Sequence, residues 1–268
     1  MSPWEVVAIL LAGMAAGTIN TVVGSGTLIT FPTLLAFGFP PVTANVSNTI
    51  GLVPGSLSGA IGYRAELAGQ RRRLVVLGAA SFLGGIVGAL LLLSLPSAAF
   101  DAIVPVLIVL GCVLVVLGPR IQRRVAARAE DRGGLPEHGA WWVWPAIATA
   151  GIYGGYFGAA QGVLLMAILG IGVADTMQRH NATKNVLALI VNAIAAIIFV
   201  LLAFVDVPFL PSSGSGSVDW AVVGLIAAGS VVGGQIGATV GRRLPPNVLR
   251  AVIVVVGIVA VTVFVFPL

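Results

Sequence analysis

Long apolar stretches, separated by short polar segments, make up most of the chain. The longest of them carry almost no charge over about 20 positions each, and they are residues 74–95, 99–118, 185–205, 219–240 and 248–266. A helix of about 20 apolar residues crosses the ~30 Å hydrocarbon core of a bilayer. The pattern therefore predicts an all-α polytopic membrane protein, since the strands of a membrane β-barrel would show short alternating segments instead.

Shorter apolar segments bring the expected number of segments to ten. They are residues 4–23, 28–39, 41–63, 141–157 and 162–172, and segment 185–205 extends back to residue 176. Segments 28–39 and 162–172 are too short to cross a bilayer alone. Each follows a break, Gly24-Ser25-Gly26-Thr27 and Gly158-Ala159-Ala160-Gln161-Gly162. The sequence leaves open whether these two segments span the membrane or re-enter it.

Composition excludes a soluble domain of ordinary make-up. The 268 residues are 58% hydrophobic and 9% charged, against about a quarter charged in soluble domains. The basic residues behind the net charge of +5 lie in loops between the apolar segments. We therefore interpret them as a topology signal and not as a nucleic-acid surface. Cys112 is the lone cysteine, and it offers neither a disulfide nor a cysteine metal site.

The chain contains an internal repeat. A shift of 134 residues superposes Gly17 on Gly151, Gly24 on Gly158 and Thr49 on Thr183, and a shift of 149 superposes Gly84-Gly85 on Gly233-Gly234. The 15-residue difference falls at the segment 206–219. We therefore predict an N-terminal transmembrane repeat over 1–118, a basic cytoplasmic linker over 119–134, and a C-terminal transmembrane repeat over 135–268.

The positions of lysine and arginine predict how the repeats are oriented. These residues gather in segments 64–73, 120–132 and 241–250, while segment 206–219 has none. Cytoplasmic loops are enriched in lysine and arginine, so segment 206–219 is expected outside. Because 64–73 and 206–219 are equivalent loops of the two repeats, the repeats are predicted to have inverted topology, with both termini outside.

Inverted repeats place a substrate site near the bilayer midplane, where interrupted segments of the two halves meet. A helix that begins inside the membrane has unpaired N–H groups and a partial positive charge, and glycine lets an anion approach that backbone. The breaks therefore predict an anion pocket, with N–H groups 25–28 and 160–163 facing the anion. The alternative is that these glycines only permit close helix packing, as is expected of Gly84, Gly88, Gly233 and Gly237.

The candidate substrate-binding residues lie at the two breaks, near the end of segment 4–23, and at the starts of segments 41–63 and 176–205. They are Asn20, Ser25, Gly26, Thr27, Asn48, Thr49, Gln161, Arg179, Thr183 and Lys184. Polar groups in a membrane usually face the bundle interior or a cavity. A structural interpretation stays open for several of them and their neighbours.

In that alternative, Arg179, His180 and Lys184 snorkel to the cytoplasmic interface and Asp175 is a helix N-cap. Asn20 and Asn192 would then only join helices.

The motifs of ATP-driven or metal-dependent enzymes are absent from the sequence. It contains no Walker loop, no HExxH and no CxxC, which are the signatures of nucleotide and metal sites. We therefore expect no enzyme and no cofactor, and transport energy that comes from an ion gradient.

At these residues the chain resembles the sulfite exporter TauE/SafE family of permeases. The first half is similar through Gly13…Gly17…Asn20, the Gly24-Ser25-Gly26 break, Pro32, Pro40-Pro41 and Ala44-Asn45…Thr49; the second half is similar through Gly151…Gly154-Gly155…Gly158 and Ala182-Thr183-Lys184-Asn185…Asn192. The resemblance implies a bacterial inner-membrane permease for sulfur-containing anions such as sulfite or an organosulfonate. The second break departs from the family pattern, since the family more often has further glycine where this chain has Ala159 and Ala160.

Two other functions fit the same sequence. A passive anion channel would use the same pocket, and a membrane scaffold would use the glycines for packing alone. The sequence indicates a small anion and the lipid bilayer as partners, and no nucleic acid. It does not give the direction of flux, the coupling ion or the oligomeric state.

Overall fold

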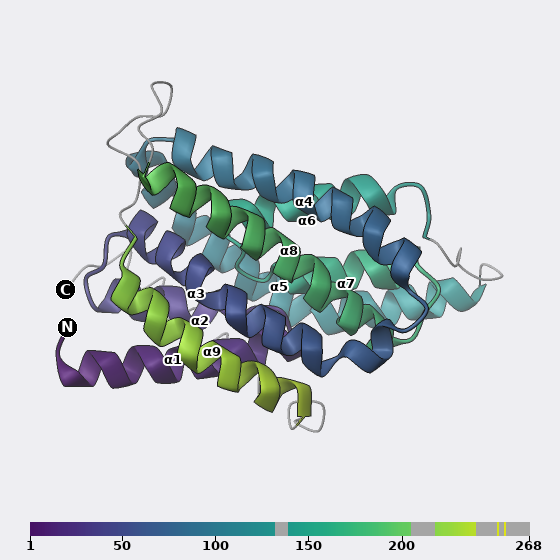
Figure 1. Cartoon of the computed structure of the whole chain (residues 1–268). Coiled ribbons are helices and arrows are strands. Elements are labelled where there is room, and N and C mark those ends of the chain that lie inside the picture. Colours follow the sequence, from purple (N-terminus) through teal and green to yellow (C-terminus); the bar gives the residue numbers. More distant parts are fainter. Residues whose placement is uncertain (132–138, 205–217, 240–250, 252–254, 256–268) are drawn as a thin grey trace.

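The computed structural model describes residues 1–131, 139–204, 218–239, 251 and 255 (Figure 1). Within these ranges the ordered elements are helices and no strand occurs. They are α1 (Pro3–Val22), α2 (Thr27–Ala36), α3 (Pro41–Gly62), the 3₁₀ helix η1 (Arg64–Leu67), α4 (Arg71–Ser94), α5 (Ser97–Asp131), α6 (Val143–Tyr156), α7 (Gln161–Gly172), α8 (Met177–Phe204) and α9 (Trp220–Thr239).

Each of the first nine predicted segments corresponds to one of these helices, and the tenth, 248–266, lies outside the described residues apart from two positions. Five of the described helices are long and apolar enough to cross a membrane. They are α1, α4, α8 to Ala203, α9, and the part of α5 from Ser97 to Leu117. The described part of the chain is therefore all-helical, and the protein is a multi-pass membrane protein.

The basic stretch 120–132, expected to be a loop, is helical up to Asp131, because α5 continues without interruption for 35 residues. After Pro119 this stretch contains no glycine or proline up to Asp131. It is rich in alanine and arginine, which are strong helix formers. The predicted linker 119–134 therefore begins as an extension of a helix.

Local sequence explains where several helices begin. The side chains of Ser2 and Glu5 each accept a hydrogen bond from the other residue's N–H, at 3.3 Å and 2.9 Å, before the first turn of α1. This reciprocal capping satisfies two donors at the helix start. Pro41 occupies the first turn of α3, where its missing N–H is no loss.

The two short helices cannot span a bilayer. The 10 residues of α2 and the 12 residues of α7 correspond to about 15 Å and 18 Å at ~1.5 Å per residue. The chain folds back at the first break, since a Cβ on Gly26 would contact the carbonyl of Ala16. The α1–α2 unit is thus a helical hairpin.

Small residues allow two pairs of long helices to pack closely. α1 lies along α9 at one edge of the bundle and α4 lies along α6 at the other, with α3 and α8 between them (Figure 1). A Cβ on Gly84 would overlap the carbonyl of Ala148 in α6, and one on Gly88 would overlap that of Ile152. In the other pair, a Cβ on Gly233 would overlap the carbonyl of Met14 in α1, and one on Gly237 would overlap that of Thr18. The predicted packing role of these four glycines is confirmed.

The helix pairs match across the two halves. The shifts found in the sequence superpose α1 on α6 and α4 on α9, so the α1–α9 and α4–α6 pairs are equivalent. Even single contacts correspond: Gly17 packs against Ser230, and Gly151 packs against Ser81. In Figure 1 the central helices α3 and α8 lie side by side and run in opposite directions.

Candidate functional site

The two breaks begin with the same backbone geometry. Gly24 and Gly158 have φ angles of 88° and 75°, in the left-handed region that favours glycine after a helix. Their N–H groups donate to the carbonyls of Ile19 and Tyr153, at 3.0 Å and 3.1 Å. The next helices begin three residues later, at Thr27 and Gln161.

These breaks contact each other directly. The N–H of Gly162 donates to the carbonyl of Gly24 at 3.0 Å, and a Cβ on either glycine would overlap the Cα of the other. Ser25 and Gln161, the chain neighbours of these glycines, therefore lie at the same crossing. The crossing joins α2 and α7, the two shortest α-helices of the described chain.

Part of the backbone expected to face an anion is already hydrogen bonded. Besides Gly162, the N–H groups of Leu28, Gln161 and Val163 donate to carbonyls one turn back, at 3.0–3.2 Å. Such tight first turns satisfy the free donors of a helix start. In this conformation the crossing thus offers an anion fewer N–H groups than the eight expected.

The side chains at the crossing retain free polar atoms. Ser25 is fully buried and Gln161 is 3% exposed. Among the described residues, Ser25 Oγ and Gln161 Nε2 have no hydrogen-bond partner. The Gln161 side chain fills the space beside Gly154, where a Cβ would overlap its amide. A buried polar atom without a partner costs about 1–3 kcal/mol, so these two atoms are candidates for contact with a ligand.

Lys184 reaches the end of α1, just before the first break. Its side chain is fully buried, and Nζ donates to the carbonyls of Asn20 and Thr21 at 3.0 Å and 3.2 Å. The amides of Asn181 and Asn185 donate to the same Thr21 carbonyl, at 3.2 Å and 3.4 Å. A helix C-terminus carries partial negative charge and attracts a cation. The snorkelling interpretation of Lys184 is therefore wrong, and that of His180, 4% exposed, fails as well.

The end of α6, before the second break, is capped by neutral groups. The Asn45 amide donates to the Tyr156 carbonyl at 3.0 Å, and the Tyr153 hydroxyl donates to the carbonyl of Ala159. The central helix of each half, α3 or α8, thus caps the end of a helix in the other half, α6 or α1. Of these two caps, only the one from the second half, Lys184, is a cation.

Three further predicted residues lie between α2 and α3, near the first break. The Thr30 hydroxyl donates to Asn48 Oδ1 at 2.5 Å, and the Asn48 amide donates to Thr27 Oγ1 at 3.4 Å. Thr49 is buried on the same helix. These contacts join neighbouring helices of the first half. Likewise, Asn192 donates to Ser56 at 3.1 Å between α8 and α3, which confirms its interhelical role.

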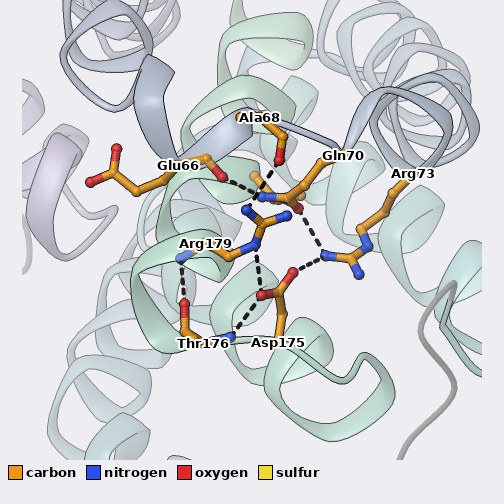
Figure 2. A network of polar contacts seen from close by, with 8 residues as sticks. Glu66, Ala68, Gln70, Arg73, Asp175, Thr176 and Arg179 are labelled. Carbon is orange, nitrogen blue, oxygen red and sulfur yellow. Dashed lines mark hydrogen bonds and ion pairs between the residues drawn. The ribbon is translucent and has the colours of Figure 1, made fainter.

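Arg179 and Thr183 belong to a separate polar network, drawn in Figure 2. Asp175 binds Arg179 Nε at 2.8 Å through one oxygen and the Arg73 guanidinium at 2.5 Å through the other. Arg73 also donates to Gln70 Oε1 at 2.8 Å, and Thr183 donates to the same oxygen at 2.9 Å. The network links the start of α4 to the turn before α8.

The network fixes the charge of Asp175. Burial alone would raise the pKa of this carboxyl, but hydrogen bonds from Arg73, Arg179 and the Thr176 N–H outweigh it and hold the pKa below its ordinary value. Asp175 is not the helix N-cap that the alternative expected. Thr176 takes that place, because its hydroxyl accepts from the Arg179 N–H at 3.4 Å.

The ten predicted residues thus fall into two regions. Asn20, Ser25, Gly26, Thr27, Asn48, Thr49, Gln161 and Lys184 surround the breaks, while Arg179 and Thr183 join the polar network. Sequence reasoning missed Gln70 and Arg73, whose segment was interpreted only as a topology signal. It did not count Asn181 and Asn185 among the binding residues, although they share a helix face with Lys184.

Comparison with known proteins agrees with this architecture. The model of the family described as Sulfite exporter TauE/SafE matches residues 9–264. The "Probable membrane transporter protein YfcA" of Escherichia coli (strain K12) is 26% identical over 97% of this chain and 89% of its own length. A "Probable membrane transporter protein" of Haemophilus influenzae is 24% identical, over 94% of this chain and 91% of its own length.

No solved structure matches the chain. The family match covers nearly all of the helices described above, and both relatives are named as membrane transporters. The chain therefore belongs to the sulfite exporter TauE/SafE family and is a membrane transporter of that type.

Proposed function

We propose that the protein is a secondary transporter of a small sulfur-containing anion, such as sulfite or an organosulfonate, bound at the crossing of the two breaks. The observation that carries the proposal is Lys184, a fully buried lysine in a membrane-spanning helix. It has no ion-pair partner among the described residues. A buried charge is costly and marks a functional site in a membrane protein.

The proposed pocket surrounds the Lys184 ammonium. Ser25 Oγ and Gln161 Nε2 are the buried polar atoms available at the crossing. A hydroxyl and an amide N–H donate to oxyanions, and hydrogen bonds to charged groups are stronger than neutral ones. The anion would thus replace backbone carbonyls as the partner of Lys184 and satisfy both atoms.

The proposal includes inverted topology and a midplane site. Its support is the opposite direction of α3 and α8 (Figure 1), the equivalent breaks, and short helices that begin where the halves meet. Transporters with inverted repeats alternate access by moving one bundle against the other around such a site. With basic segments inside, both termini lie outside the inner membrane of a bacterium.

The choice of anion follows the family description, which names sulfite. The names of the relatives give no substrate. The chemistry of the crossing, one cation with hydroxyl and amide donors, fits a compact oxyanion that presents several acceptor oxygens.

Uptake of radiolabelled sulfite into proteoliposomes tests this function. The expected flux is saturable and depends on an ion gradient, and Lys184→Met and Ser25→Val reduce it. Thr149→Val is the matched control, because Thr149 is exposed on α6 and bonds only within its own helix. Flux that does not saturate would indicate a channel instead. No flux, together with no stabilisation by sulfite, would indicate a scaffold.

A further inference from the structure

A cavity of about 200 Å³ lies beside the polar network of Figure 2, between the start of α4 and the turn before α8. Its charged lining residues are Arg72, Arg73, Arg179 and Asp175, and Gln70 also lines it. The cavity is separate from the crossing of the breaks, whose residues do not line it. Its volume is large enough for a small oxyanion with water.

The lining carries an excess of positive charge. Three arginines face one carboxylate, and their accessibility is graded: Arg72 is exposed, the Arg179 side chain is 32% exposed, and the Arg73 side chain is 7% exposed. A cleft lined by one sign of charge concentrates ions of the opposite sign and speeds their association. The cavity therefore attracts anions from the surrounding water.

Asp175 already makes the bonds that an anion would make. Its two oxygens accept from Arg73 and from Arg179, at 2.5 Å and 2.8 Å. Guanidinium groups bind carboxylates and other planar or tetrahedral oxyanions in the same geometry. The carboxylate thus orients the two arginines while no anion is bound.

Hydrogen bonds and a shared helix connect the lining of the cavity with Lys184. Gln70 Oε1 accepts from Arg73 and from Thr183, and Thr183 is the chain neighbour of Lys184. Arg179 and Lys184 are five residues apart on α8, about 7.5 Å along the axis at ~1.5 Å per residue. A single helix therefore presents cations to both places.

We propose that this cavity, the arginine vestibule, binds the transported oxyanion at the basic end of the bundle, where the anion displaces Asp175 from Arg179 and Arg73 before it moves on to Lys184. The inference rests on the proposed function for the identity of the anion. The vestibule is a second binding site, distinct from the pocket at the breaks.

Calorimetric titration of sulfite into purified protein tests the vestibule without transport. In Lys184→Met the pocket loses its cation, and the vestibule is expected to account for the remaining binding. Adding Arg179→Gln or Arg72→Gln weakens that binding about 3- to 10-fold, while Asp175→Asn strengthens it, because the competing carboxylate is gone. Arg71→Gln is the matched control, since exposed Arg71 is the neighbour of Arg72 but does not line the cavity.

The outcomes separate the two proposals. Equal sulfite binding by Lys184→Met with and without Arg179→Gln, in folded variants with unchanged melting temperatures, overturns the vestibule. If Arg72→Gln and Arg71→Gln weaken binding equally, general surface charge explains the effect and the vestibule is also overturned. If the native protein shows no sulfite flux but Arg179 still governs binding, the proposed function fails and the vestibule stands as an anion-binding site without a role in transport.

Discussion

The ends of α1 and α6 share one backbone design but differ in charge. At each end a glycine with positive φ leaves the helix, and the central helix of the other half donates to the last carbonyls. The α1 end receives the ammonium of Lys184, while the α6 end receives the neutral amide of Asn45. The two helix ends are therefore alike in their backbone and differ in the charge of their cap, and under the proposed function the anion lies nearer to α1.

Glycine serves different purposes at equivalent positions of the two breaks. Gly26 has right-handed backbone with φ of −59°, and it is needed because a Cβ would contact the Ala16 carbonyl. The equivalent residue, Ala160, has φ of 61°, in the left-handed region that strains an alanine. A glycine at position 160 would adopt this backbone without strain.

The largest effect is expected from the shared crossing. Gly162→Ala places a methyl group on the backbone of Gly24, and Gly24→Ala does the reverse and adds strain at positive φ. Each change is expected to lower the free energy of unfolding by about 3 kcal/mol or more, visible as lost monodisperse protein and a lower melting temperature. Gly170→Ala is the control on α7, because its Cβ has open space. Equal stability of Gly162→Ala and Gly170→Ala would contradict the contact between the breaks.

Removing each of the two caps, Lys184 and Asn45, tests whether their difference in charge matters for binding. Lys184→Met keeps the size of the side chain but removes the cation, and it is expected to weaken sulfite binding to the pocket about 10- to 100-fold, as for loss of a charged hydrogen bond. Asn45→Leu removes the neutral cap at the other end and is expected to change binding by less than about 3-fold. Calorimetry gives both affinities. Equal losses would show that charge does not distinguish the two ends.

A smaller change is expected at the second break. Ala160→Gly relieves the left-handed strain, and although glycine increases the entropy of the unfolded chain, the net gain is about 0.5–1 kcal/mol. Gly26→Ala, at the equivalent position, is expected to destabilise the protein because of the Ala16 carbonyl. Thermal unfolding in detergent measures both. A loss of stability in Ala160→Gly would show that the two breaks do not differ in strain.

The smallest effect concerns stability at acid pH. Only the second half carries the carboxylate of Asp175, since the equivalent residue in the first half is Pro41. The pKa of Asp175 is lower in the folded protein than its ordinary value. The ion pairs therefore contribute full stability above the ordinary pKa of about 3.9, and the contribution is lost as the pH falls through the lowered folded pKa. In melting curves from neutral pH to pH ~3, Asp175→Asn should show a flatter acid limb than the native protein. If the melting temperatures of the variant and the native protein fell equally with decreasing pH, the contribution of the Asp175 ion pairs would be contradicted.

Much of the helical framework follows from the sequence because hydrophobic length and glycine spacing are local signals. They predicted the nine described α-helices, the start of α3 at Pro41, and the four packing glycines. The extension of α5 beyond residue 118 was missed, because the charged residues after it were taken to end the helix, whereas they end only its membrane-spanning part. Propensity alone would have extended it.

The site was harder to predict because its bonds join distant parts of the chain. Arg73 and Asp175 are 102 residues apart, and neither position reveals the other. Lys184 binds backbone carbonyls, which leave no signature in residue types. The breaks themselves were predicted, since both are visible as glycine next to a short apolar segment, but their direct contact at Gly162 required the fold.

The length of α5 has a practical consequence. Its 35 residues measure about 52 Å at ~1.5 Å per residue, whereas the bilayer interior accounts for about 30 Å. Roughly 20 Å of continuous helix therefore projects beyond the hydrocarbon, assembled on the same axis as a transmembrane segment. A helical tag fused so that it continues this helix would keep a fixed orientation relative to the protein. Such a tag would serve as a rigid marker for the alignment of particles of a small protein in electron microscopy.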